Sequence, residues 1–171
     1  RLNIPNFKFD TADSHLAGSA VIDLPTDKRQ LKWNAVLAAN NFNPQSSSTA
    51  APVNVLNGQF KANGFALPNQ QVIHLNDINL TGRLVNQNEN VHLTGQSTIA
   101  LLFHDAKAGG GFKSFAVNYD GGLNASAIQG SEGHLKLKLS GTQELIKISD
   151  LRHSGVAGQI VADGLLHLNQ G

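Results

Sequence analysis

The chain contains nearly the same sequence twice, as HLAGSAVIDL at residues 15–24 and as HLTGQSTIAL at residues 92–101. Five of the ten positions are identical, and four of the five share one parity, namely a leucine, a glycine, an isoleucine and a second leucine. In a β-strand, side chains of one parity lie on one face of the sheet. The repeated feature is therefore one strand face, which is apolar and carries a glycine where a side chain is expected.

Apolar and polar residues alternate in most other segments as well. Examples are LKWNAVLA at 31–38, INLTGRL at 78–84 and HLKLKLSG at 134–141. No segment shows the periodicity of an amphipathic helix, and clusters of Gly, Pro, Asn and Asp separate the alternating runs. Closely spaced strands of this kind predict an all-β fold built as an antiparallel meander.

Glycines recur within the apolar parity of these predicted strands. Glycine inside a strand marks a bulge, a bend or a close approach of two backbones, and small residues on one face let a sheet curl toward that face. We therefore expect the apolar face to be concave. The glycines assigned to this curvature are Gly18, Gly58, Gly64, Gly95 and Gly158.

A curled sheet either closes into a barrel or sandwich filled by its own side chains, or stays open. The chain offers few large side chains for filling, with one Trp, one Tyr, eight Phe and no Met. The predicted fold is an antiparallel meander curved into an elongated open trough or half-barrel with an apolar concave face. A closed, filled sandwich is the alternative.

The large apolar residues of this parity are the candidate binding residues, because they would line the concave face. Their expected role is to solvate apolar material such as an acyl chain or a client segment. The candidates are Leu16, Ile22, Leu24, Trp33, Leu37, Phe60, Ile78, Leu80, Leu93, Ile99, Leu135, Leu137 and Ile160.

Composition argues against several classes of function. The 13 basic and 12 acidic residues are balanced and scattered, whereas nucleic-acid binding needs a basic patch. His15, His92, His134 and His167 each precede a leucine of the apolar parity, which places them on the opposite, solvated face. There is no cysteine and no catalytic or metal-binding motif. We therefore predict no enzymatic activity, no metal and no cofactor.

The 171 residues are interpreted as one β-sheet segment excised from a larger protein, with loose internal repeats near 6–67, 75–141 and 148–168. Asp150-Leu151 stands in the third repeat where Asp77-Ile78 stands in the second. The low-complexity stretch NPQSSSTAAP at 43–52 is expected to be a loop between strands rather than a linker between domains.

Residues 31–67 resemble the TamB branch of the AsmA-like superfamily. The matching pattern is a strand with Trp33, the corner Asn41-Phe42-Asn43-Pro44, a loop with Pro52, and a strand that carries Leu56, Gly58, Phe60, Ala62 and Gly64. Residues 75–101 resemble the repeated unit of the same family, which has an Asp-Leu or Asp-Ile strand, a polar turn and a returning apolar strand. Residues 149–168 echo this unit.

The resemblance implies a periplasmic β-groove that belongs to an inner-membrane-anchored protein of diderm bacteria. It further implies a non-enzymatic conduit that shields phospholipid acyl chains on their way to the outer membrane and supports outer-membrane biogenesis. One alternative is a chaperone-like platform for β-strands of outer-membrane protein clients, acting with a TamA-type barrel bound by the full-length parent. A closed adhesin-like sandwich is a second alternative.

Overall fold

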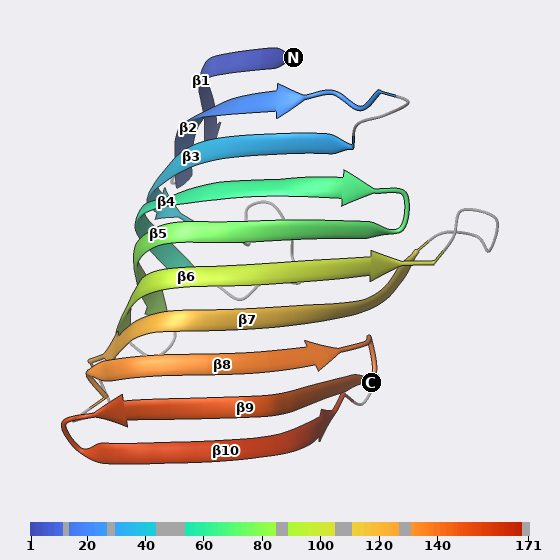
Figure 1. Cartoon of the computed structure of the whole chain (residues 1–171). Coiled ribbons are helices and arrows are strands. Elements are labelled where there is room, and N and C mark those ends of the chain that lie inside the picture. Colours follow the sequence, from blue (N-terminus) through green and yellow to red (C-terminus); the bar gives the residue numbers. More distant parts are fainter. Residues whose placement is uncertain are drawn as a thin grey trace.

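The computed structural model describes residues 1–11, 14–26, 30–43, 54–84, 89–104, 111–126 and 131–168. These residues form ten β-strands (Figure 1). The strands are β1 (Leu2–Thr11), β2 (Ser14–Asp23), β3 (Leu31–Phe42), β4 (Asn54–Leu67), β5 (Gln70–Leu84), β6 (Glu89–Phe103), β7 (Phe112–Ala125), β8 (Gly133–Gly141), β9 (Leu145–Gly155) and β10 (Gly158–His167).

All ten strands belong to one antiparallel sheet in which each strand lies beside the next one in the sequence. β1 and β10 form the two edges, at opposite ends of the stack (Figure 1). The sheet is not closed into a barrel, so the predicted all-β meander with an open trough is confirmed and the closed sandwich is wrong. The predicted loop at 43–52 lies outside the described residues except for Asn43.

The sheet forms a single layer. Within the described part of the chain, no second layer of strands or helices covers either face. The solvent-accessible surface is 11348 Å², whereas a compact monomer of this mass would expose only about 8,100 Å². The hydrophobic side chains buried among the described residues are correspondingly few and mostly small: Ala39, Ala62, Val72, Ile78 and Ala125.

The two copies of the repeated sequence lie in register across the sheet. Residues directly opposite each other on paired strands share a face, so their partners can be followed from β2 to β6. Leu16 is connected in this way to Leu93, through Ala39, Gly58 and Leu80. Ile22 is connected to Ile99 through Trp33, Gly64 and Ile73. The second copy of the repeat, in β6, therefore lies at the same height as the first copy, which is four strands away in β2.

The strands bend where extra residues interrupt their pairing. β1 gains one residue between Ile4 and Phe7, and β5 gains one between Leu75 and Ile78, at the corresponding place four strands away. Asp77 occupies this second bulge with a positive φ of 50°. Bulges bend the strand that carries them and increase its twist. In Figure 1 the strands turn sharply near one end.

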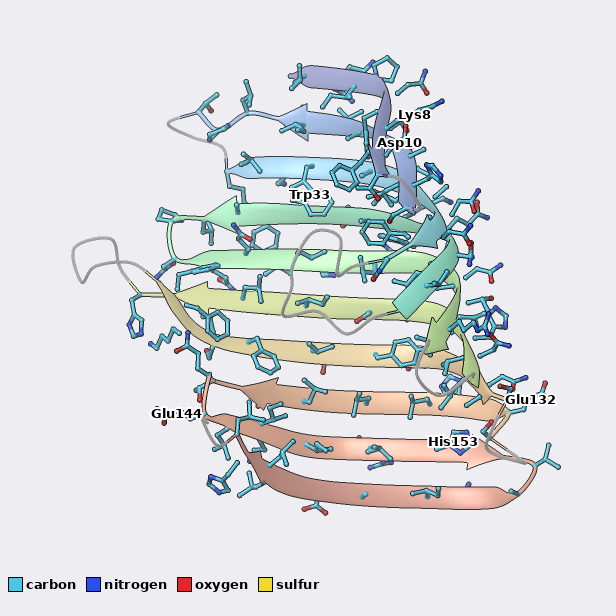
Figure 2. All side chains as sticks on the ribbon, turned by 180° about the vertical axis from the view of Figure 1, so that it is seen from behind. Lys8, Asp10, Trp33, Glu132, Glu144 and His153 are labelled. Carbon is cyan, nitrogen blue, oxygen red and sulfur yellow. The ribbon has the colours of Figure 1, made fainter. Side chains whose placement is uncertain are left out.

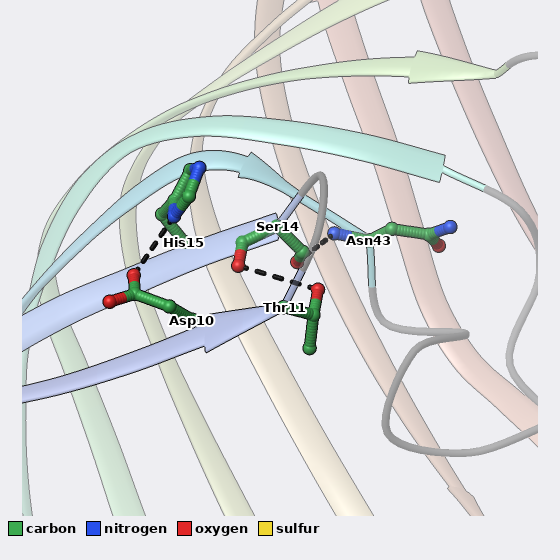
Figure 3. A network of polar contacts seen from close by, with 5 residues as sticks. All are labelled: Asp10, Thr11, Ser14, His15 and Asn43. Atoms are coloured by element: carbon green, nitrogen blue, oxygen red, sulfur yellow. Dashed lines mark hydrogen bonds and ion pairs between the residues drawn. The ribbon is translucent and has the colours of Figure 1, made fainter.

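A buried serine at the start of β2 is hydrogen-bonded to the residue that follows β3. Ser14 is 1% exposed, and its hydroxyl oxygen accepts a hydrogen bond of 2.9 Å from the backbone N–H of Asn43 (Figure 3). The hydroxyl of Thr11 donates to the carbonyl oxygen of Ser14 at 3.5 Å. Beside this pair, Asp10 contacts His15 across the strands at 2.9 Å.

Two glycines on the apolar face provide a matched test of how closely the backbones of neighbouring strands approach each other. A Cβ at Gly121 would overlap the carbonyl oxygen of Thr94 and lie 2.9 Å from the Cα of Gly95, whereas a Cβ at Gly164 meets nothing within 4 Å. We expect Gly121→Ala to lower the free energy of unfolding by about 1–3 kcal/mol, because the neighbouring strand must shift. Gly164→Ala should leave it unchanged or raise it by up to about 1 kcal/mol. Urea denaturation measures both, and equal effects would contradict this account.

Candidate functional site

The candidate site is the apolar face of the sheet, defined here as the face that carries Trp33. One row of directly opposed residues on this face crosses all ten strands. It consists of Leu2, Ile22, Trp33, Gly64, Ile73, Ile99, Val117, Leu139, Ile148 and Gly164. Every member is apolar, and the strands bend around this face (Figure 2).

Strand register places twelve of the thirteen candidate lining residues on the apolar face. Leu24 is the exception, because β2 ends at Asp23 and Leu24 lies 56% exposed beside Pro25. Ile160 shares the face but belongs to the edge strand and is 59% exposed. The predicted set thus forms one continuous surface apart from Leu24.

Three glycines of the apolar face are covered by aromatic rings from neighbouring strands. Trp33 lies directly opposite Gly64, and its Cζ2 atom is 2.9 Å from the place where a Cβ would stand. The same relation joins Phe7 to Gly18 and Phe115 to Gly141. A ring that lies across a glycine shields the backbone and flattens the surface. At these three positions, the gap that the sequence predicts is filled by a ring from the neighbouring strand.

Two of the predicted curvature glycines, Gly58 and Gly95, combine close backbone contact with positive φ angles of 128° and 120°. Only glycine adopts this conformation without strain. Gly158 differs, because a Cβ there would meet nothing within 4 Å and the residue opens β10 directly after the hairpin turn. Gly158 is thus a turn glycine. Gly121 and Gly133 were not singled out from the sequence, although both lie against the backbone of a neighbouring strand.

Three polar side chains on the apolar face were missed, although the alternation around NYDGG contains Tyr119 at the correct parity. The Tyr119 hydroxyl lies 2.8 Å from the carbonyl oxygens of both Thr94 and Gly122 and donates to them. The Ser97 hydroxyl donates to the carbonyl of Asn118 at 3.0 Å. His153 Nε2 lies 2.8 Å from the carbonyl of Ser131. These three polar groups are thereby bonded to the backbone rather than directed at a ligand, whereas Gln71, opposite Leu101 on the same face, is exposed.

The opposite face of the sheet is polar and carries balanced charges. Asp120 contacts Nε2 of His134 at 2.7 Å and Nζ of Lys136 at 3.4 Å, while Arg152 bonds to Asp150 at 2.8 Å. Asp120, Lys136, Asp150 and Arg152 border a hollow of about 600 Å³. His15, His92, His134 and His167 are all exposed, with the side-chain parity of this face. No group of three or more His, Cys, Asp or Glu among the described residues could hold a metal ion.

A salt bridge of 2.6 Å joins Lys61 on the polar face to Asp77 in the bulge of β5. The hydrogen bond to the Asp77 carboxylate raises the pKa of Lys61 above its usual value. Both side chains are mostly exposed, so the pair adds little stability. Its position shows instead that the bulge turns the Asp77 side chain toward the polar face.

Tyr119 should titrate at unusually high pH. Burial raises the pKa of its phenol above 10.0, and the negative charge of Asp120 acts in the same direction. Its contribution to stability is therefore present below pH 10 and is lost as the pH rises through the pKa of the folded state. Tyr119 is the only tyrosine, so phenolate absorbance reports this group alone. A titration midpoint at or below 10 in the folded protein would contradict the burial of the hydroxyl, and Tyr119→Phe supplies the baseline.

Comparisons of the chain with protein-family models, with curated proteins and with solved structures found no match. Within the described residues, no helix is long and apolar enough to span a membrane. The site is therefore assessed from its own geometry.

Proposed function

We propose that this chain is a segment of a non-enzymatic hydrophobic conduit whose apolar face shields phospholipid acyl chains from water. The observation that carries the proposal is the apolar row from Leu2 to Gly164, which crosses every strand of a single-layer sheet. Monomeric soluble proteins rarely expose continuous apolar surfaces of this kind unless the surface binds something.

The dimensions and energetics of the row suit an acyl chain. Neighbouring strands lie about 4.8 Å apart, so ten strands extend the row over roughly 43 Å. One acyl chain spans half of a hydrocarbon core about 30 Å thick, or roughly 15 Å. Removing each methylene from water is worth about 0.8 kcal/mol. A flexible chain laid along the row would therefore gain several kcal/mol without any directional contact.

The polar groups of the apolar face favour an apolar ligand over a polar one. The side chains of Ser97, Tyr119 and His153 already bond to backbone carbonyls, so a ligand with hydroxyl or charged groups would find few partners there. Buried polar ligand groups without partners cost binding energy. On this proposal the acyl tail occupies the trough, and the headgroup stays in water.

The resemblance to the TamB branch supplies the setting for this proposal. The conduit would work in the periplasm as part of an inner-membrane-anchored parent and carry phospholipids toward the outer membrane, in support of outer-membrane biogenesis. A TamA-type barrel would be a partner of the parent protein. Service as a platform for outer-membrane protein clients is the competing proposal.

Photo-crosslinking tests whether the apolar or the polar face of the sheet contacts lipid. A photoreactive residue at Ile22 or at Leu137 should form adducts with phospholipid acyl chains, because both side chains lie on the apolar face. The same residue at Lys138 is the matched control, since it is adjacent in sequence and points to the opposite face. Mass spectrometry identifies the adducts. Protein adducts in place of lipid at Ile22 and Leu137 would support the client platform and contradict the conduit.

A charged substitution within the row should block acyl-chain binding. Ile73 lies two strands from Trp33 in the row, and the next residue, His74, lies on the polar face. A charge in a hydrocarbon environment costs about 2.5–3.5 kcal/mol, so Ile73→Asp should weaken binding by about tenfold or more. Quenching of Trp33, the only tryptophan, by phospholipids with brominated chains measures this. Equal quenching in Ile73→Asp and in the control His74→Asp, with both proteins folded, would refute the proposal.

A further inference from the structure

The hollow of about 600 Å³ on the polar face, called here the polar hollow, lies between two bulged strands. β5 and β9, which are four strands apart, each gain one residue relative to their neighbours. Asn76 of the β5 bulge and Asp150 of the β9 bulge both line the polar hollow. Its volume is within the range of sites that hold small molecules.

The charged side chains of the polar hollow leave positive charge unpaired. They comprise three basic and two acidic residues, namely Lys136, Lys138, Arg152, Asp120 and Asp150. Both carboxylates are already engaged, Asp120 by Lys136 at 3.4 Å and Asp150 by Nε of Arg152 at 2.8 Å. Within the described part of the chain, no ion pair engages Lys138 or the two terminal nitrogens of Arg152. The polar hollow therefore suits one additional anionic group.

Strand register brings the three cations of the polar hollow together. Lys136 and Lys138 are two residues apart on β8 and share a face, and Arg152 lies directly opposite Lys136 on β9. Like charges directly opposite each other are destabilising, so an anion placed between them is favourable. The planar guanidinium group binds a carboxylate or a phosphate through two parallel hydrogen bonds.

Neutral hydrogen-bonding groups from β5, β6 and β7 form the other side of the polar hollow. They are the side-chain amides of Asn76, Gln96 and Asn118, and no hydrogen bond among the described residues engages them. Each amide offers both donors and an acceptor, which matches the hydroxyl groups of a sugar. We propose that the polar hollow binds a sugar that carries one anionic group, either a carboxylate or a phosphate. This site is independent of the lipid-binding proposal, because it lies on the opposite face from the apolar row.

A smaller hollow of about 290 Å³ lies at the equivalent place between β1 and β5, and Lys61 is the one charged residue among its described lining residues. Asn63 in the smaller hollow lies in the same row of opposed residues as Lys138, four strands away. By the same register, Val36 of β3 corresponds to Asp120 of β7. The bulged sheet thus forms without these additional charges, and exposed ion pairs add little stability. The charges of the polar hollow are therefore better explained by binding than by folding.

NMR titration of the whole chain with glucuronic acid and with glucose 6-phosphate, each compared with glucose, tests this proposal. We expect at least one of the acidic sugars to bind about tenfold or more tightly than glucose, because hydrogen bonds to charged groups are the stronger ones. The amide signals that shift should belong to β7, β8 and β9. Lys138→Asn, which installs the residue of the smaller hollow, should weaken this binding by about tenfold. Lys147→Asn is the matched control, since Lys147 is an exposed lysine of the polar face outside the polar hollow.

Lys138 and Lys147 are both exposed, so the two variants should fold, which their NMR spectra verify. Binding of only one acidic sugar would support the proposal and identify the anionic group. Failure of both acidic sugars to bind, equal affinity for glucose, or an affinity that Lys138→Asn leaves unchanged would each overturn it. Acetate or inorganic phosphate that binds as tightly as the corresponding acidic sugar would also overturn it, because the site would then recognise the anion alone.

Discussion

Pairing between neighbouring strands carries nearly the whole fold, because within the described part of the chain no second layer packs against the sheet. Most side chains of the apolar face are only half-buried, and what covers them belongs to the adjacent strands. The glycine–aromatic pairs show this most directly, since the ring of Trp33 fills the space above Gly64 on the next strand. Among the described residues, the structure is thus maintained strand by strand, through contacts between neighbouring strands.

The sheet is open, and bulges contribute to its curvature. A barrel closes when strands tilt and stagger until the last strand meets the first. Here the bulges of β1 and β5 interrupt the pairing at the same place along the strand, so these two strands bend at the same height. The curvature then lies along the strands, and the trough runs across them. Further strands of the same kind lengthen such a trough without closing it.

Alternation within single strands identified the apolar face, because side-chain direction in a strand depends on parity alone. Alternation did not predict the positions of side chains where the strands depart from regular geometry. The extra residue at Asp77 reverses the parity, so that Ile73 and Leu75 share a face with Ile78 although simple alternation separates them. The aromatic covering of Gly18 and Gly64 depends on register between strands, which no single segment encodes. Leu24 was misplaced because β2 ends one residue earlier, at Asp23.

The shape of the apolar face also bears on the proposed ligand. A flat apolar sheet would pack against another sheet, as in a sandwich, and would aggregate. A concave face does not match a second concave face, and the outer surface is polar, with salt bridges such as Asp120–Lys136. Rings lying over glycines keep the floor of the trough shallow. A thin, flexible chain can follow such a floor where a rigid sheet cannot, and this is the physical reason why the proposal places an acyl chain rather than a folded partner on this face.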